Sequence, residues 1–246
     1  SPIMTPELRE RMSESALRVA EASDYTNAGS VEFLYSQGNY YFMEMNTRLQ
    51  VEHTISEIIT GIDIVKQQIA ISAGESLPFG QEDLSIRGHA IECRINAEDP
   101  LNNFAADPGK IIRYRSPGGP GIRVDSGIHM GYTIPPNYDS MIAKLCAWDS
   151  TRREAIKRMR RAISEYIILG IKTTLPLHYA IMNNQQFVEG NTHTHFLQDE
   201  HIFDTLERYR RDEETRMQTL AGSFGQGKKV AAISAAVNMY LQPKKD

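Results

Sequence analysis

Two glutamates of this chain lie inside apolar stretches, where a buried carboxylate needs a partner. Glu32 stands within Val-Glu-Phe-Leu-Tyr, and Glu44 stands between two methionines. Two β-rich runs, 30–35 and 40–45, flank a segment of turn composition, so the sequence predicts a β-hairpin. A three-residue turn at 37–39 places positions that sum to 76 opposite each other. Glu32 is then predicted to face Glu44.

Two carboxylates that face each other across a hairpin repel, and a divalent cation between them reverses the sign of the interaction. Asn46 follows Glu44 by two residues, so its amide oxygen is predicted on the same strand face. Two carboxylates and an amide oxygen suit Mg²⁺ or Mn²⁺. Mg²⁺ held by so few carboxylates usually also binds substrate phosphates. The alternative is that both glutamates are edge-strand side chains that reach solvent.

Three further polar side chains follow at a spacing of two: Arg48, Gln50 and Glu52. If the strand stays extended, they lie on the same face as the paired glutamates. A guanidinium and an amide next to a hard cation form an anion site, and a carboxylate there supplies a base. The chain then turns into a helix near residue 53, so free backbone N–H groups, such as that of Val51, also face an anion.

Helices and turns surround this segment. Thr5 caps a predicted helix that has Pro6 in its first turn and ends near Asp24. Gly61 divides 52–74 into two helical pieces, the second of which is capped by Asp63.

From residue 89 onward, the pattern changes to strands. Residues 89–96 alternate apolar and polar side chains, and further strands are predicted at 110–115, 122–125 and 141–148. A basic amphipathic helix follows the Thr151 cap and reaches about residue 166, and another helix covers about 174–183. The basic run of the first of these helices is interpreted as a solvated face. This order predicts the α+β class.

Changes in pattern divide the chain into three predicted parts: residues 1–85, residues 86–200 with the antiparallel strands, and residues 201–246 as a helical tail. In the tail we expect a charged helix at 203–217, a flexible joint at 222–229 and a short apolar helix at 231–241.

Composition excludes several classes of protein. The chain has 246 residues and a formal charge of −4, which argues against a nucleic-acid binder and against a polybasic membrane-surface protein. No stretch reaches 18 uncharged apolar residues, so no transmembrane span is predicted. The two cysteines, Cys93 and Cys146, are too few for a disulfide framework. We interpret them as buried free thiols in a reducing cytoplasm.

The string E-M-N-T-R-L-Q-V-E-H at 44–53 resembles the E-M-N-x-R-x-Q-V-E-H signature of the biotin carboxylases, which belong to the ATP-grasp superfamily. The likeness continues in G-H-A-I-E-C-R-I-N-A-E-D-P, in the P-G-G-x-G-I-R-V-D loop and in Y-D-S-M at 138–141. It implies the C-terminal part of an ATP-grasp domain, followed by an antiparallel-sheet biotin carboxylase C-terminal domain with flanking helices. It also implies a reaction in which ATP and bicarbonate form carboxyphosphate and the carboxyl group passes to N1′ of biotin on a carrier.

The resemblance assigns roles to the residues of the predicted hairpin. Glu32, Glu44 and Asn46 correspond to metal ligands, and the two glutamates together with Leu34 also belong to the ATP site. Met43 is implied to lie near the adenine, although the core of any β-strand would also use Leu34 and Met43.

The same resemblance places the chemistry in the segment after the hairpin. Arg48 corresponds to the arginine that stabilises the biotin enolate, and Glu52 to the base that deprotonates bicarbonate. Gln50 and the Val51 amide correspond to bicarbonate contacts. Arg94 corresponds to an arginine that serves both bicarbonate and biotin; the alternative is a solvated strand arginine.

Further segments have weaker assignments. Tyr138 and Asp139 are implied to support the biotin pocket, although a buried loop turn explains them almost as well. His193 and His195 have no carboxylate cluster nearby in the sequence, so a nucleotide-side contact is preferred over a metal site. The loop at 117–121 carries Pro120 where an aromatic residue is common, although Arg123 is retained. A homodimer through the C-terminal domain is still expected.

The family's Rossmann-like domain and glycine-rich ATP lid have no counterpart here, and the first lysine is Lys66. We therefore expect a C-terminal part of a longer protein that is inactive alone. The tail resembles that of separate biotin carboxylase subunits of prokaryotic pyruvate carboxylase. That likeness favours such a parent, whose partners are a biotin carboxyl carrier and a carboxyltransferase subunit. The alternatives are acetyl-CoA or propionyl-CoA carboxylase, another ATP-grasp ligase, and a non-catalytic oligomerisation module.

Overall fold

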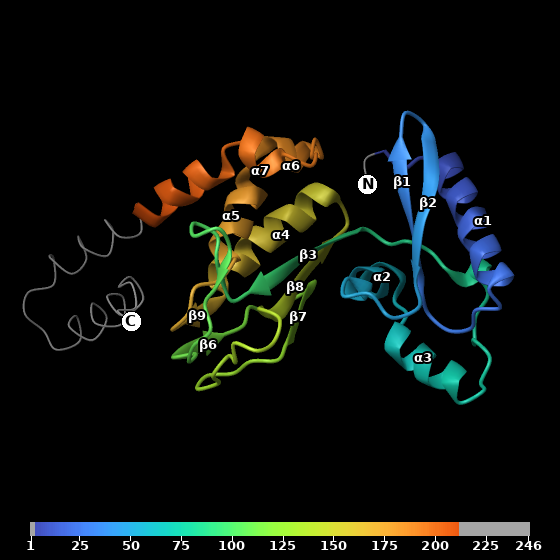
Figure 1. Cartoon of the computed structure of the whole chain (residues 1–246), viewed down its shortest axis with the longest axis horizontal. Helices are drawn as coiled ribbons and strands as arrows, with labels where there is room; N and C mark the ends of the chain where they lie inside the picture. The colour runs from blue at the N-terminus through green and yellow to red at the C-terminus, as the bar shows by residue number, and fades with distance from the viewer. Residues whose placement is uncertain (1–2, 212–246) are drawn as a thin grey trace, which may run out of the picture. The chain divides into compact units, whose positions relative to one another are not determined.

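The computed structural model describes residues 3–211 of the chain, which divides into two compact units (Figure 1). The first unit ends at Ala90 and the second begins at Ile91. Within the described residues, no helix is both long enough and apolar enough to cross a membrane.

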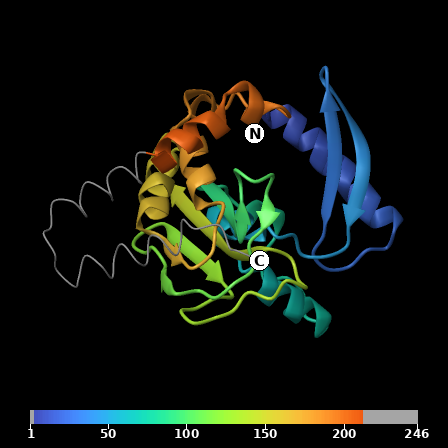
Figure 2. The same ribbon diagram turned by 60° about the vertical axis from the view of Figure 1, so that its left-hand side comes forward.

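The first unit combines one β-hairpin with helices. Its elements are α1 (Pro6–Ala22), β1 (Ser30–Ser36), β2 (Asn39–Asn46), α2 (His53–Thr60), α3 (Ile64–Ser72) and the 3-10 helix η1 (Gln81–Asp83). The predicted helix boundaries are confirmed: the Thr5 hydroxyl accepts the Leu8 N–H at the start of α1, and Asp63 caps α3. Gly61 ends α2 with φ +80°, a backbone conformation that glycine adopts without strain. Helix α1 lies along one face of the hairpin (Figures 1 and 2).

The hairpin has a two-residue turn, and the predicted three-residue turn is wrong. Ser36 pairs with Asn39, so that Gln37 and Gly38 form the turn, with φ values of +49° and +82°. Positive φ at both central residues matches the twist of the flanking strands, which explains why the shorter turn is adopted. Pairs near the turn therefore sum to 75, but a β-bulge next to Glu32 restores the sum of 76. The predicted pairing of the two glutamates is confirmed, although by a different route.

The second unit is α+β. It contains β3 (His89–Asn96), β4 (Glu98–Asp99), β5 (Ala105–Ala106), β6 (Arg113–Arg115), β7 (Ile122–Ser126), β8 (Met141–Asp149), α4 (Arg152–Glu165), β9 (Ile167–Leu169), α5 (Leu175–Asn183), α6 (Gln185–Glu189) and α7 (Phe196–Asp199). Strands β3, β8 and β7 form one sheet in that order, and β7 is antiparallel to β8. Helix α4 packs on β8. Residues 202–211 are also helical.

The core of the second unit lies between this sheet and α4. The residues predicted to face inward from α4 are buried: Ala155, Ile156, Met159 and Ile163. They meet side chains of β3 and β8, among them Ile95 and Leu145, which have no exposed surface. Cys93 and Cys146 are buried thiols outside any disulfide, as predicted. Burial raises the pKa of the Cys93 thiol, so this thiol stays protonated and unreactive.

The predicted strand at 110–115 is too long. Only Arg113–Arg115 form a strand, β6, which pairs with β9. Lys110 makes only an isolated bridge to Thr133. The start of this segment hydrogen-bonds to one part of the chain and its end to another, so no single long strand forms. The charged helix expected at 203–217 is helical as far as residue 211. Its remainder, the joint at 222–229 and the apolar helix at 231–241 lie outside the described residues.

The interpretation of the basic run of α4 as a solvated face is wrong for three half-buried arginines, Arg152, Arg158 and Arg160, and holds for Arg161, which is exposed but shares the same kind of contact. Each donates to a backbone carbonyl oxygen of another segment. The pairs are Arg152 with Phe187, Arg158 with Trp148, Arg160 with Met182, and Arg161 with Gly118. A guanidinium can reach over the helix surface to a loop carbonyl, and helical periodicity alone does not reveal such a bond.

Candidate active site

The two opposed glutamates share one hydrogen-bond donor. Asn46 Nδ2 lies 2.9 Å from Glu32 Oε1 and 2.9 Å from Glu44 Oε1. Glu32 is half-buried, whereas Glu44 is exposed. Among residues 3–211, neither carboxylate forms an ion pair with a lysine, an arginine or a histidine. The two negative charges are therefore offset only by neutral amide donors, chiefly that of Asn46.

The β-bulge decides that both carboxylates lie on one face of the hairpin. Between the turn and Phe33, which pairs with Phe42, the strands follow the register set by the two-residue turn. If that register continued, Glu32 would lie opposite Met43, and Glu44 would point to the other face, because a one-residue shift reverses every side chain. The extra residue in β2 brings Glu44 opposite Glu32.

This donor set suits a hard divalent cation. Two carboxylates without a cationic partner attract such an ion, and a half-turn of the Asn46 amide group presents Oδ1 in place of Nδ2. No group of three or more His, Cys, Asp or Glu side chains with metal-binding geometry occurs within the described part of the chain. A site with two carboxylates and an amide is the smaller kind that leaves room for substrate oxygens.

The hydrogen-bonded network continues from the carboxylates into the segment before α2. Gln50 Nε2 lies 3.5 Å from Glu32 Oε1, and Gln50 Oε1 lies 3.4 Å from Arg48 Nη1. Arg48 also donates to the Leu49 carbonyl oxygen, at 3.2 Å. The side chains of Arg48 and Gln50 are therefore brought together with the glutamate pair.

The prediction that this segment stays extended as far as Glu52 is wrong. Strand β2 ends at Asn46, and Val51 and Glu52 form a turn that leads into α2. The turn arises because the Gln50 carbonyl oxygen accepts the His53 backbone N–H at 3.2 Å and lies 2.8 Å from His53 Nδ1. Glu52 is exposed at the N-cap of α2, and its carbonyl oxygen accepts the Ile55 N–H. This bond of His53 was not predicted. The only signal in the sequence was the position of His53 in the first turn of a helix.

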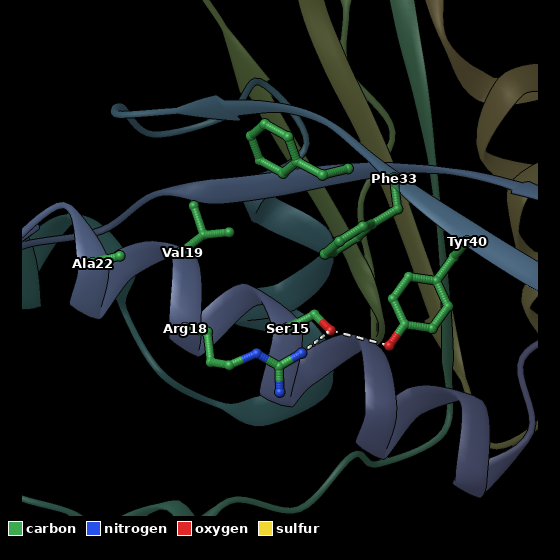
Figure 3. Close-up of a pocket in the computed structure, with 7 residues that line it drawn as sticks. Ser15, Arg18, Val19, Ala22, Phe33 and Tyr40 are labelled. Atoms are coloured by element: carbon green, nitrogen blue, oxygen red, sulfur yellow. Dashed lines mark hydrogen bonds between the residues drawn. The ribbon is translucent and has the colours of Figure 1, made fainter.

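The other face of the hairpin packs on α1 and is separate from the carboxylate network. Phe33, Tyr40 and Phe42 line a groove with residues of α1, and the Tyr40 hydroxyl lies 3.0 Å from Ser15 Oγ (Figure 3). Leu34 belongs to the carboxylate face and is 60% exposed, and Met43, at the bulge, is 48% exposed. An apolar surface therefore adjoins the two glutamates.

Arg94 belongs to β3 in the second unit. Its side chain is 51% exposed, and its Nε lies 3.9 Å from Oε1 of Glu92, whose side chain is 6% exposed. The carbonyl oxygen of Arg94 accepts hydrogen bonds from Thr174 and His178, two residues that sequence analysis did not identify.

The following residues, to which the family resemblance gave only a weakly supported role, were also located in the structure. Tyr138 is 81% exposed, and the Asp139 carboxylate accepts the Met141 N–H at 2.7 Å. His193 Nε2 lies 3.8 Å from Asp199, one carboxylate rather than a metal-binding cluster.

Two family models match the chain. The model of the carbamoyl-phosphate synthase L chain ATP-binding domain matches residues 1–79, and the model of the biotin carboxylase C-terminal domain matches residues 92–199.

Curated relatives share high sequence identity with the chain. A pyruvate carboxylase subunit of Methanothermobacter thermautotrophicus is 58% identical over 100% of this chain and 50% of its own length. Biotin carboxylase 1 of Bacillus subtilis is 52% identical over 80% of this chain and 44% of its own length. The chain thus spans about half the length of the curated relatives it matches.

Solved structures of biotin carboxylases also match the fold of this chain. The biotin carboxylase subunit of a pyruvate carboxylase matches with a TM-score of 0.80 and 51% identity, over 82% of this chain and 46% of that one. The biotin carboxylase domain of a thermophilic 2-oxoglutarate carboxylase, solved with bicarbonate, matches with a TM-score of 0.80 and 48% identity, over the same shares of the two chains.

Residues 92–199 therefore match the C-terminal domain of the biotin carboxylases, and most of the chain is similar in sequence and fold to members of the biotin carboxylase family. Within the family, the likeness to the pyruvate carboxylase subunit of Methanothermobacter thermautotrophicus extends over the whole chain.

Proposed function

We propose that this chain is the C-terminal half of a biotin carboxylase, which uses ATP and bicarbonate to carboxylate biotin on a carrier protein. Residues 1–85 form the end of the ATP-grasp domain, residues 86–200 form the biotin carboxylase C-terminal domain, and residues 201–246 form a tail. The observation that carries the proposal is the network that joins the side chains on one face of the hairpin to those of the following segment: Glu32, Glu44, Asn46, Arg48 and Gln50.

The carboxylate pair would hold the metal ion that the nucleotide phosphates bind. Glu32, Glu44 and, after rotation of its amide, Asn46 would bind Mg²⁺ or Mn²⁺, which neutralises phosphate charge when bound. Leu34 and Met43 offer apolar surface beside these ligands, where an adenine ring would lie. Glu32 and Glu44 thus belong both to the metal site and to the ATP site.

The segment before α2 handles bicarbonate. Arg48, Gln50 and the Val51 N–H supply donors for the anion, and Arg94 of the second unit supplies another guanidinium. Glu52, exposed at the N-cap of α2, takes the bicarbonate proton as general base. Arg48 then stabilises the negative charge of the biotin enolate, and a preorganised donor at that charge accelerates the reaction, whereas Arg94 serves to bind biotin as well as bicarbonate.

We further propose that the parent is a cytoplasmic pyruvate carboxylase in which this polypeptide serves a biotin carboxyl carrier and a carboxyltransferase subunit. The support is the similarity, over the whole chain, to one subunit of such an enzyme. Arg123, expected in a homodimer contact through the C-terminal domain, pairs with Asp125 at 2.8 Å and so presents a fixed polar surface.

The purified chain alone should show no biotin-dependent ATP cleavage at any Mg²⁺ concentration, because ATP, bicarbonate and biotin must be positioned together and misplacement is costly. Activity should return when the N-terminal half of a close relative is supplied, covalently or in trans. The assay measures phosphate release with free biotin, with and without bicarbonate. Robust cleavage by the chain alone, or none after complementation, contradicts the proposal. When a biotin carboxyl carrier and a carboxyltransferase subunit specific for pyruvate, acetyl-CoA or propionyl-CoA are also supplied, the combination that carboxylates its acceptor identifies the parent.

A further inference from the structure

Strand β3 is an edge strand, and its outer side forms hydrogen bonds with the start of α5. The sheet order is β3, β8, β7, so only one side of β3 faces another strand of that sheet. On its other side, the Asn96 carbonyl oxygen accepts the Thr174 N–H at 3.1 Å, and the Asn96 N–H donates to Thr174 Oγ1 at 3.0 Å. Thr174 lies directly before α5 and is buried.

The carbonyl oxygen of Arg94 is held from the same helix by two side chains. Thr174 Oγ1 lies 3.1 Å from it and His178 Nε2 lies 2.8 Å from it. A carbonyl oxygen only accepts, so His178 carries its proton on Nε2 and donates it there. Thr174 Oγ1 accepts from Asn96 and therefore gives its own proton to Arg94. Both lone pairs of the Arg94 carbonyl oxygen are thus occupied.

These bonds fix the backbone from which the Arg94 side chain leaves. Two donors on one carbonyl oxygen fix the orientation of the peptide plane between residues 94 and 95, and with it ψ of Arg94. The direction of the Arg94 Cα–Cβ bond follows from that backbone. The Arg94 side chain is long and 51% exposed, so this direction determines which region its guanidinium can reach.

We propose that His178, acting together with Thr174, is a positioning residue for the Arg94 guanidinium. This inference rests on the proposed role of Arg94 in binding bicarbonate and biotin. His178 itself touches no substrate in this proposal. It acts through the Arg94 backbone, from a helix that contributes no other residue to the site.

The test in the complemented enzyme compares His178→Leu, which removes the donor at similar volume, with His178→Gln, which retains an N–H donor. Misplacement of a reacting group by 1 Å costs about 10²-fold, so we expect His178→Leu to raise the KM for bicarbonate about tenfold. The KM for ATP should stay unchanged, and His178→Gln should recover most of the loss. His129→Leu is the matched control, because it removes another histidine–carbonyl contact, that with Met130, without touching β3.

A second readout needs no turnover. In NMR spectra of this chain alone, His178→Leu and Thr174→Val should each shift the Arg94 Nε–Hε signal, and Thr174→Val should also speed amide exchange at Asn96, whereas His178→Gln should leave these signals close to wild type.

Two results overturn the proposal: an unchanged KM for bicarbonate in His178→Leu, and an Arg94 signal that does not respond to any of these variants. An inactive wild-type enzyme instead counts against the proposed function, and the NMR result still decides the positioning role.

Discussion

Glu32 and Glu44 face each other across the β1–β2 hairpin, and Asn46 donates one hydrogen bond to each of them. Neither the turn nor the alternation of the strands produces this relationship by itself, because the two-residue turn sets a register that would separate the two carboxylates onto opposite faces. The bulge in β2 shifts the register by one residue directly next to Glu32. The carboxylate pair therefore depends on Met43 being left out of the strand pairing.

Removing one of the opposed charges should stabilise the free chain while it destroys metal binding. Like charges directly opposite in a sheet destabilise it, by up to about 1 kcal/mol. Glu44→Gln retains an oxygen that accepts from Asn46, so we expect a small rise in the free energy of unfolding in urea without divalent ions. Glu75→Gln, at an exposed position, is the control and should change little. A less stable Glu44→Gln chain would show that the two carboxylates do not repel.

Deleting the bulge residue should preserve the carboxylate pair. Without Met43, the register set by the turn leads directly to Glu32 opposite Glu44, and Phe42 keeps its place against α1. We expect the melting temperature to stay within a few degrees of wild type, since 1 kcal/mol shifts it by about 2–4 °C at this size.

The control for that experiment is the deletion of Tyr41. It keeps the two glutamates opposite each other only by moving Phe42 to the carboxylate face, away from its groove with α1. Full burial of such a side chain is worth about 1.5–3 kcal/mol; because Phe42 is 54% exposed, about half of this is lost, and the variant should melt a few degrees lower. Equal melting temperatures for the two deletions would argue against the register described here.

Substitution of Arg48 should separate chemistry from nucleotide binding. In the complemented enzyme, Arg48→Ala removes one donor at a developing negative charge, a loss that typically lowers the rate about 10²–10³-fold. The affinity for ATP should remain nearly unchanged, because Arg48 bonds to Gln50 and Leu49 and not to the metal ligands. Arg9→Ala, on the exposed surface of α1, is the control. Weakened ATP binding with normal turnover would refute the assignment.

The neutral ring of His178 should make stability depend on pH. Burial lowers the pKa of His178, and its hydrogen bond to the Arg94 carbonyl oxygen opposes this only in part. As pH falls below about 6.5, the unfolded chain therefore binds the proton before the folded chain does. The contribution of His178 to stability is complete above that pH and is lost as pH falls toward the lower pKa of the folded state.

Urea unfolding at pH 7 and pH 5 measures this effect. We expect the loss of stability between the two values to be smaller in His178→Gln than in wild type. His89→Gln is the control, because His89 is exposed. An identical pH dependence in wild type and His178→Gln would contradict a lowered pKa of the half-buried His178 ring.

Local signals in the sequence predicted most of the fold. Caps and breakers such as Thr5, Gly61 and Asp63 fixed the helix boundaries because they act on backbone groups one turn away. The opposition of Glu32 and Glu44 was predicted correctly from a wrong turn, since a bulge leaves no distinct mark in a run of β-forming residues. The partners of Arg94 were missed because Thr174 and His178 lie 80 and 84 residues away. The roles of the site residues, by contrast, came from family resemblance and stay predictions.

The arginines of α4 give the second unit a kind of attachment that acid and salt barely affect. Each of four guanidinium groups holds a backbone carbonyl oxygen of another segment. Arginine keeps its proton at every accessible pH, and an amide carbonyl does not titrate in that range. Such contacts persist where carboxylates become protonated, and mobile ions screen a charge–dipole contact at about 3 Å far less than distant charges. The loops around α4 should therefore remain attached in mildly acidic, concentrated salt solution, in which exposed pairs such as Lys157 with Glu154 no longer contribute.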